Sequence, residues 1–409
     1  MIELASRFLS ILYLMLKPIV HVRIGLIKHR SIGSLTGNTE YFLRCEKVIA
    51  QRQRELKILI SGNNPVNRQI LTMLKRSSWV IESDWLWSLL NNIRQNYLSN
   101  EVGSTKDFEK GLWCNLDHAG MRRLQDKSEW NPWQEAGPQL TFTRAELERG
   151  QEILQFIGIP ASQPYVCMHA RDRLYTDSPD FTRDPSDHFS FFDYRDCDIE
   201  TYIPAANFLA EKGVWVIRVG HMEPDVSLGS ENSMIIDYAS HFRKHIDDSE
   251  FADVYLQAHC RFFLGCTAGI HYYSHIFDVP MALVNMAPLA ESGRSMHDLF
   301  ILKKYWNTVH KRYMTWSEMI DRGAGGNRLW HDQQAALENE GIEIHSNTPV
   351  EVLELVREME ARLSGEWIEK SEDHLLQERF KAVFPENHCM CDFPGYAGSG
   401  FLRDNQNAS

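Results

Sequence analysis

The sequence has no hydrophobic run long enough to cross a bilayer. Its apolar stretch near the amino terminus, residues 8–16, holds nine residues before Lys17 and Pro18, whereas a spanning helix needs about 20. The stretch also lacks the small-residue cleavage site that ends a secretory signal. We therefore expect a cytoplasmic protein, whose first helix packs on the core or rests on the inner face of the membrane as a peripheral contact.

Cysteine is sparse and follows no metal-binding or disulfide pattern. Eight cysteines are spread over 409 residues, several inside apolar runs, where a free thiol behaves as a small hydrophobic group. Cys389 and Cys391 lie beside His388, but no second cysteine pair stands at zinc-ligand spacing. These patterns favour a reducing compartment and no bound metal. Cys167, two residues before His169, makes a cysteine-nucleophile hydrolase the least favoured enzyme class.

Positive charge is also in deficit, with 43 Lys and Arg against 55 Asp and Glu, a net charge of -12. This disfavours a general polyanion binder and removes nucleic acid from the expected partners. A local basic pocket for a single diphosphate stays compatible with it. The hydrophobic fraction of 43% and aromatic fraction of 11% predict a large packed core rather than disorder.

Strand-like and helix-like runs alternate along the chain, which is typical of an α/β protein with parallel sheets. The length favours two domains, and we expect two Rossmann-like domains facing a central cleft, at 1–160 and 161–365, followed by a terminal helix and tail at 366–409. Strands are predicted at 20–25, 56–61, 79–81, 165–168, 214–219, 261–265 and 281–284. Helices are predicted at 40–53, 67–75, 84–96, 143–157, 199–212, 253–259, 271–277, 349–365 and 368–384.

One predicted strand, residues 165–168, ends abruptly in His169, Arg171 and Asp172. Burying these groups inside a strand would cost several kcal/mol unless they were paired, so we place them at its carboxyl end, where open α/β sheets bind ligands. A guanidinium there would hold a phosphate through two parallel hydrogen bonds. The alternative is a strand-end ion pair of Arg171 with Asp172 or Asp196.

A second strand end, at Gly265, leads into Thr267, Ala268 and Gly269 and then a predicted helix. Backbone N–H groups and a hydroxyl at a helix start form an anion site. The segment lacks both GxGxxG and the phosphate-loop lysine, which disfavours dinucleotide and triphosphate chemistry of those types. The alternative is that small residues only permit a tight turn.

Two further strand ends carry candidates. Arg218 and Gly220 follow the predicted strand at 214–219, at the edge next to the first site, and we expect them to contact a ligand. A Gly-containing turn, residues 32–39, includes Gly33 and Asn38 and precedes Glu40. Glu40 is our first choice of general base, with Asp172 second; the alternative is a first-turn acid that favours the helix dipole.

These segments together resemble a family of bacterial proteins described as glycosyltransferases. The resemblance rests on residues 33–40, 165–172, 194–204, 213–220, 263–271, 279–285 and 401–402, and so covers most of the chain. The family is distantly similar to protein O-fucosyltransferases and related GT-B enzymes, in which a His-x-Arg at the start of the second domain binds the diphosphate of a sugar nucleotide. Residues 173–190 are longer than that pattern, and their role as a lid or acceptor loop is an expectation.

The resemblance implies roles for individual residues. Arg171 would hold the β-phosphate and His169 would shape the sugar and phosphate pocket. The first domain would be the acceptor side and the second the nucleotide-sugar side. The remaining residues implied to approach the nucleotide, from the second domain or across the cleft, are Thr267, Ala268, Gly269, Gly33 and Asn38.

The implied reaction is displacement at an anomeric carbon. It needs no cofactor, and the donor, a GDP- or UDP-sugar, is a co-substrate. Arg171 and the helix start would each stabilise the leaving diphosphate by about 3 kcal/mol, without a metal, since the Asp-x-Asp at Asp196 and Asp198 is interpreted as a helix cap. The acceptor is a glycan, a lipid-linked sugar or a protein, and inversion is favoured. Two rivals stay open: an epimerase or hydrolase of nucleotide sugars, and a non-catalytic nucleotide- or glycan-binding scaffold.

Overall fold

The computed structural model describes residues 21–48, 55–97, 113–114, 116, 131–172, 193–220, 232–289, 293, 295–322, 331–386, 390–391 and 393–405. The chain divides into two compact units. Unit 1 is Met1–Gly120 with Pro132–Thr143, and unit 2 is Met121–Asn131 with Arg144–Ser409. Each is described by itself. The apolar segment 8–16, where a peripheral membrane contact is expected, lies outside the described residues. Among the described residues, no helix is both long enough and apolar enough to cross a bilayer.

Unit 1 holds a parallel three-stranded sheet in the order β1-β2-β3. Its strands are β1 (His21–Leu26), β2 (Glu55–Ser61) and β3 (Trp79–Glu82), and its main helices are α2 (Thr39–Val48), α3 (Arg68–Ser77) and α4 (Asp84–Tyr97). The strand and helix predictions for 20–96 are thereby confirmed as to type. A buried cluster of Leu26, Ile60, Leu90, Ile93 and Trp113 joins the sheet to α4.

The Gly-containing turn predicted at 32–39 is wrong. Residues Ser34–Asn38 form a π-helical turn that runs directly into α2. Gly33 has helical backbone angles, and the Thr36 hydroxyl donates to the Ile32 carbonyl oxygen at 2.5 Å. Glycine permits a turn but does not require one, so neighbours that bond in helical register decided the conformation.

Unit 2 is built on a seven-stranded parallel sheet in the order β13-β9-β8-β7-β4-β5-β6. Its strands are β4 (Tyr165–Met168), β5 (Trp215–Arg218), β6 (Ile235–Asp237), β7 (Phe263–Gly265), β8 (Met281–Met286), β9 (Leu299–Leu302) and β13 (Tyr396–Ala397). The central strands are buried along their whole length, as expected of a parallel sheet covered on both faces. The prediction of an α/β fold with parallel sheets is confirmed.

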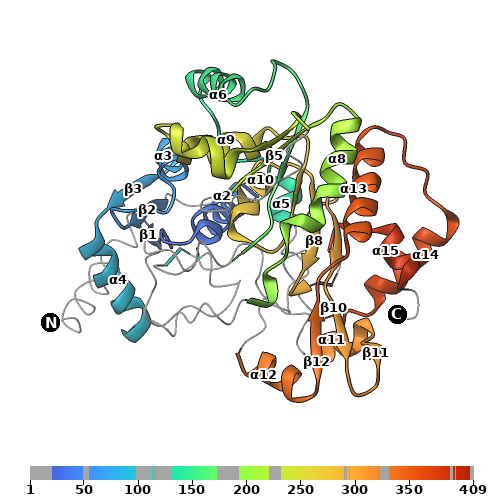
Figure 1. The fold of residues 1–409 in the computed structure, drawn as a ribbon. Helices are drawn as coiled ribbons and strands as arrows, with labels where there is room; N and C mark the ends of the chain where they lie inside the picture. Colours follow the sequence, from blue (N-terminus) through green and yellow to red (C-terminus); the bar gives the residue numbers. More distant parts are fainter. Residues whose placement is uncertain are drawn as a thin grey trace. The chain divides into compact units, whose positions relative to one another are not determined.

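The described part of unit 2 also holds helices. They are α6 (Arg144–Phe156), α8 (Ile203–Glu211), α9 (Ser249–Ala258), α10 (Tyr272–His275), α11 (Trp316–Asp321), α12 (His331–Asn339), α13 (Pro349–Leu363), α14 (Ser371–Ala382) and α15 (Ser399–Asp404). Figure 1 shows α8 and α13 side by side, and both contact the sheet. α13 begins with a capping box between Thr348 and Glu351, which satisfies the first backbone donors of the helix.

The main segment of unit 2 begins at Arg144, and the predicted division into Rossmann-like domains at residue 160 stays a prediction. Helix α6 belongs to unit 2, because Gly150 lies against the Tyr255 ring of α9 and the Gln151 amide donates to the Tyr255 hydroxyl at 2.9 Å. The terminal segment 366–409 is likewise part of unit 2, since β13 extends the large sheet beside β9. A sequence pattern shows where a helix ends but not which sheet it covers.

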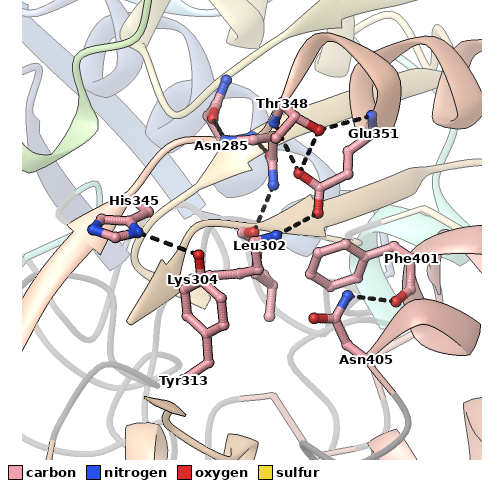
Figure 2. A network of polar contacts seen from close by, with 10 residues as sticks. Asn285, Leu302, Lys304, Tyr313, His345, Thr348, Glu351, Phe401 and Asn405 are labelled. Carbon is pink, nitrogen blue, oxygen red and sulfur yellow. Dashed lines mark hydrogen bonds and ion pairs between the residues drawn. The ribbon is translucent and has the colours of Figure 1, made fainter. Parts of the chain in front are cut away.

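A small antiparallel sheet, which the sequence analysis did not predict, follows β9. It consists of β10 (Lys304–Asn307), β11 (Arg312–Tyr313) and β12 (Ile342–His345), in the order β11-β10-β12. Lys304 of β10 donates to the Glu351 carboxylate of α13 at 2.8 Å (Figure 2). The side chain of Asn347, which follows β12, donates to the Leu302 carbonyl oxygen at the end of β9, at 2.9 Å. These bonds fix the carboxyl end of β9.

Candidate functional site

The candidate site lies at the carboxyl edge of the seven-stranded sheet, where the chain changes direction. From β4 the chain runs to β5 and β6 on one side and then returns to β7, β8 and β9 on the other. The point between β4 and β7 is therefore a topological switch point, where the loops leaving two adjacent strands diverge. His169, Arg171 and Asp172 follow β4, and Cys266 and Thr267 follow β7.

Arg171 bridges the two strand ends. Its backbone N–H donates to Cys266 Sγ at 3.2 Å, and its carbonyl oxygen accepts from the Cys197 N–H at 3.1 Å. Its guanidinium pairs with the Asp196 carboxylate, and the two side chains are 12% and 22% exposed. The ion-pair alternative is thus present, with Asp196 as the partner. The arginine and the small-residue turn after β7 also lie at one place, as the diphosphate interpretation requires.

His169 is fixed and neutral. Its backbone N–H donates to Leu264 and its Nδ1 lies 2.9 Å from the Val219 carbonyl oxygen. A carbonyl only accepts, so Nδ1 carries a proton and any other hydrogen bond of the ring uses Nε2. Burial lowers the pKa of His169 to about 4, although the Val219 bond and the charge of Asp172 oppose this shift. The ring is 8% exposed and adds no positive charge at neutral pH.

Arg218, at the end of β5, is 1% exposed and pairs with Asp237 at the end of β6, with Nη1 to Oδ2 at 2.9 Å. Asp237 also caps the turn after β6 by accepting from the Ser240 N–H at 3.1 Å. The charge of Arg218 contributes to the lowered pKa of His169. Arg218 therefore supplies a fixed positive charge behind the edge, and Gly220 ends the described stretch that leaves it.

The turn after β7 differs from its predicted form. The Thr267 hydroxyl is buried and directed toward β8, where it accepts from the Ala287 N–H at 3.4 Å. Ala268 and Gly269 lead into a 3-10 turn, Gly269–His271, and the four-residue helix α10. The helix predicted at 271–277 is present but shorter, since α10 ends at His275. So short a helix carries little of the macrodipole expected of a longer one, and the role of Thr267 toward a phosphate stays a prediction.

Lys303 is a site residue that the sequence analysis missed. It follows β9, it is buried, and its ammonium donates to the Asp196 carbonyl oxygen at 2.5 Å. Burial lowers the pKa of Lys303, while the nearby thiols of Cys197 and Cys266 raise it. The signal that could have revealed it is the same as for Arg171, a charged residue directly after an apolar run, here 299–302.

The predicted residues of unit 1 lie in α2 and the turn before it. Glu40 is fully buried; its carboxylate accepts from Arg44 Nε at 2.9 Å and from the backbone N–H groups of Gln139 and Leu140 at 2.7 and 3.3 Å. Burial raises the pKa of Glu40, and Arg44 counteracts the rise. These bonds give Glu40 a structural task. The roles of Gly33 and Asn38 toward a nucleotide stay predictions.

Two segments named in the sequence analysis lie outside the described residues. They are the expected lid or acceptor loop at 173–190 and the pair of His388 and Cys389. Within the ranges that the structure does describe, no group of three or more His, Cys, Asp and Glu side chains is placed to hold a metal ion.

No family model matches the chain. No curated protein matches it either. Solved structures similar to it include three glycosyltransferases. E. coli ADP-heptose LPS heptosyltransferase II is 12% identical over 64% of this chain and 84% of its own, with a TM-score of 0.38. The family 9 glycosyl transferase of Veillonella parvula is 9% identical over 77% and 95%, with a TM-score of 0.41. E. coli heptosyltransferase WaaC with ADP-2-deoxy-2-fluoro heptose is 10% identical over 78% and 99%, with a TM-score of 0.36.

Proposed function

We propose that this protein is a glycosyltransferase that moves a sugar from a nucleotide-sugar donor to a glycan, lipid-linked or protein acceptor. The observation that carries the proposal is the position of Arg171. It lies at the switch point of a parallel sheet, bridges the ends of β4 and β7, and faces a carboxylate. The resemblance of the surrounding segments to glycosyltransferases supplies the reaction class.

The donor diphosphate would take the place of Asp196 on Arg171. A carboxylate and a phosphate both present oxygen pairs that match the planar guanidinium. Arg218 ends β5, beside β4, and Lys303 follows β9, with β8 between it and β7. Both would add positive potential, although Asp237 offsets part of the charge of Arg218. As the bond to the anomeric carbon breaks, the leaving diphosphate gains negative charge, and fixed cations stabilise that charge more than the ground state. This charge set would perform the reaction without a divalent cation.

His169 would orient the sugar or phosphate rather than neutralise it. Its ring is held by the Val219 carbonyl and stays neutral, because its pKa is lowered to about 4 by burial. A neutral ring fixed at Nδ1 offers a hydrogen bond of defined direction at Nε2. Replacement by glutamine should weaken donor binding less than loss of Arg171 does.

We assign the general base to Asp172 in preference to Glu40. The Glu40 carboxylate would have to give up its bonds to Arg44 and two backbone donors in order to accept a proton from an acceptor. Asp172 is half-buried, and its charge lies close enough to His169 to raise the pKa of that histidine against the effect of burial. A positioned base contributes about 100- to 10,000-fold to a rate. Asp172→Asn should therefore abolish most turnover and leave donor binding intact.

The test is nucleotide release from a panel of GDP-, UDP- and ADP-sugars, with and without oligosaccharide, lipid-linked and peptide acceptors. A transferase releases nucleotide only when its acceptor is present, and the amount of nucleotide released equals the amount of glycosylated product formed. Release without any acceptor would instead identify a hydrolase. Conversion of the sugar while it stays attached, with no nucleotide released, would identify an epimerase. Tight binding with no release would favour the scaffold.

A further inference from the structure

Two cysteines are bonded to the backbone of Arg171, one at its N–H and one at its carbonyl oxygen. Cys266, directly after β7, accepts the Arg171 N–H through its Sγ at 3.2 Å, and the Cys197 N–H donates to the Arg171 carbonyl oxygen at 3.1 Å. Each thiol is the largest influence on the pKa of the other, which identifies them as close neighbours beside Arg171. Both are free, with Cys266 buried and Cys197 half-buried. Two neighbouring sulfurs are the starting geometry for a disulfide.

The environment of Cys197 favours its thiolate. The neighbouring Cys266 thiol lowers the pKa of Cys197 to about 7, with further contributions from the Tyr202 hydroxyl and the Lys303 ammonium, against the effect of burial. The Tyr202 oxygen lies 3.4 Å from Cys197 Sγ. A thiolate stabilised by donors and a cation is the nucleophilic form of cysteine.

A second pair, Cys167 and Cys260, provides an internal comparison. These thiols are also neighbours that influence each other's protonation, and both are buried. Here burial and the partner thiol both raise the pKa of Cys167, and the two sulfurs point to the backbone carbonyl oxygens of Leu256 and Gln257. This pair matches the first in thiol proximity and differs in charge environment, so it should stay reduced.

We propose that Cys197 and Cys266 form an oxidisable thiol pair that closes a disulfide beside Arg171. With a hydroperoxide as oxidant, the Cys197 thiolate attacks the terminal peroxide oxygen, the O–O bond breaks, and a sulfenic acid and an alkoxide or hydroxide result. Cys266 then attacks the Cys197 sulfur, the S–O bond breaks, and water leaves with the Cys266 proton. The two thiols lose two electrons and the peroxide gains them.

The disulfide would act on the same place as the proposed donor site. It would tie residues 193–197 to the end of β7, and Asp196 lies in that segment, paired with Arg171. Oxidation would thus hold the carboxylate on the guanidinium. This consequence rests on the proposed function, whereas formation of the disulfide does not.

The experiment treats the purified full-length protein with hydrogen peroxide, alkylates the remaining thiols, and maps linked peptides by mass spectrometry before and after dithiothreitol. We expect a Cys197–Cys266 peptide that dithiothreitol removes, with Cys167 and Cys260 still alkylated as thiols. Before oxidation, iodoacetamide should modify Cys197 about tenfold faster than Cys167 at pH 7, because more of it is thiolate. In Cys266→Ser, peroxide should leave a Cys197 sulfenic acid that dimedone traps.

Three results would overturn the proposal: oxidation of Cys197 only to sulfinic or sulfonic acid, a disulfide that links Cys197 to another cysteine, or equal oxidation of the two pairs. Lys303→Gln keeps both thiols and should slow alkylation of Cys197 several-fold, so an unchanged rate would also count against it. Nucleotide binding, measured on the same reduced and oxidised samples, reports separately on the donor site. A disulfide without nucleotide binding would refute the proposed function alone.

Discussion

Replacing Asp196 by asparagine should tighten the binding of a nucleoside diphosphate. In the ligand-free protein the Arg171 guanidinium is paired with the Asp196 carboxylate, so a phosphate must displace that carboxylate before it can bind. Asparagine has nearly the same shape and carries no charge. The variant therefore removes a competing anion without opening a cavity.

The size of the effect follows from the burial of the pair. The side chains of Arg171 and Asp196 are 12% and 22% exposed, so solvent screens them only in part. A hydrogen bond between charged groups contributes about 1.5 to 3 kcal/mol net, and partial exposure favours the lower end. A gain of about 1.4 kcal/mol corresponds to about tenfold in Kd. The same change should lower the free energy of unfolding by a similar amount, because Arg171 loses its partner.

The assay is isothermal titration of the variant with the nucleotide that the wild type binds, together with its urea unfolding curve. Glu360→Gln is the matched control, since Glu360 binds Arg261 through two hydrogen bonds of 2.9 Å at the beginning of β7, the opposite edge of the sheet. It should lower stability and leave Kd unchanged. Unchanged or weaker binding by Asp196→Asn would refute the displacement argument and support a purely structural ion pair.

Three further outcomes are expected. The pKa of His169 is about 4, against 6.5 for an ordinary histidine, so between these pH values the unfolded state binds more protons and stability falls as the pH drops. Between pH 7 and pH 5 the free energy of unfolding, measured in urea, should fall by about 2 kcal/mol more for wild type than for His169→Gln. Gly150→Ala places a Cβ 2.0 Å from a ring of α9 and should lower unfolding free energy by about 1 to 3 kcal/mol, whereas Gly137→Ala, with open space around it, should not. Glu40→Gln should destabilise by about 3 kcal/mol, because Arg44 is left as a buried charge; an unchanged melting curve with lost turnover would restore the assignment of Glu40 as base.

The sequence predicted the centre of unit 2 well because its strands carry two signals at once. β4 and β5 are apolar runs that are followed by or end in charged residues, and β7 ends in glycine, so both the strands and the points where they end could be recognised. The edge of the fold was harder. β13 has two residues and β11 has two, which is too short for any periodic pattern to develop.

The ion pair of Arg171 with Asp196 was one of the alternatives that the sequence offered, whereas Lys303 was missed. The role of Arg171 toward a diphosphate stays a prediction. Arg171 stands out because a charge directly after a buried strand must have a purpose. Which anion it meets depends on a segment 25 residues further on, and nothing local in the sequence selects Asp196 over Asp172. The direction of the Thr267 hydroxyl could not be predicted either, because it depends on the Ala287 N–H that follows the neighbouring strand β8.

The central claim is that Arg171 holds a nucleoside diphosphate at the switch point, and calorimetric titration of GDP, UDP and ADP tests it most directly. Wild type should bind one of the three preferentially, Arg171→Ala should bind it about 10- to 100-fold more weakly, and Arg261→Ala, at the opposite edge, should match wild type. Equal affinity of wild type and Arg171→Ala, or binding by none of the three, would contradict the account.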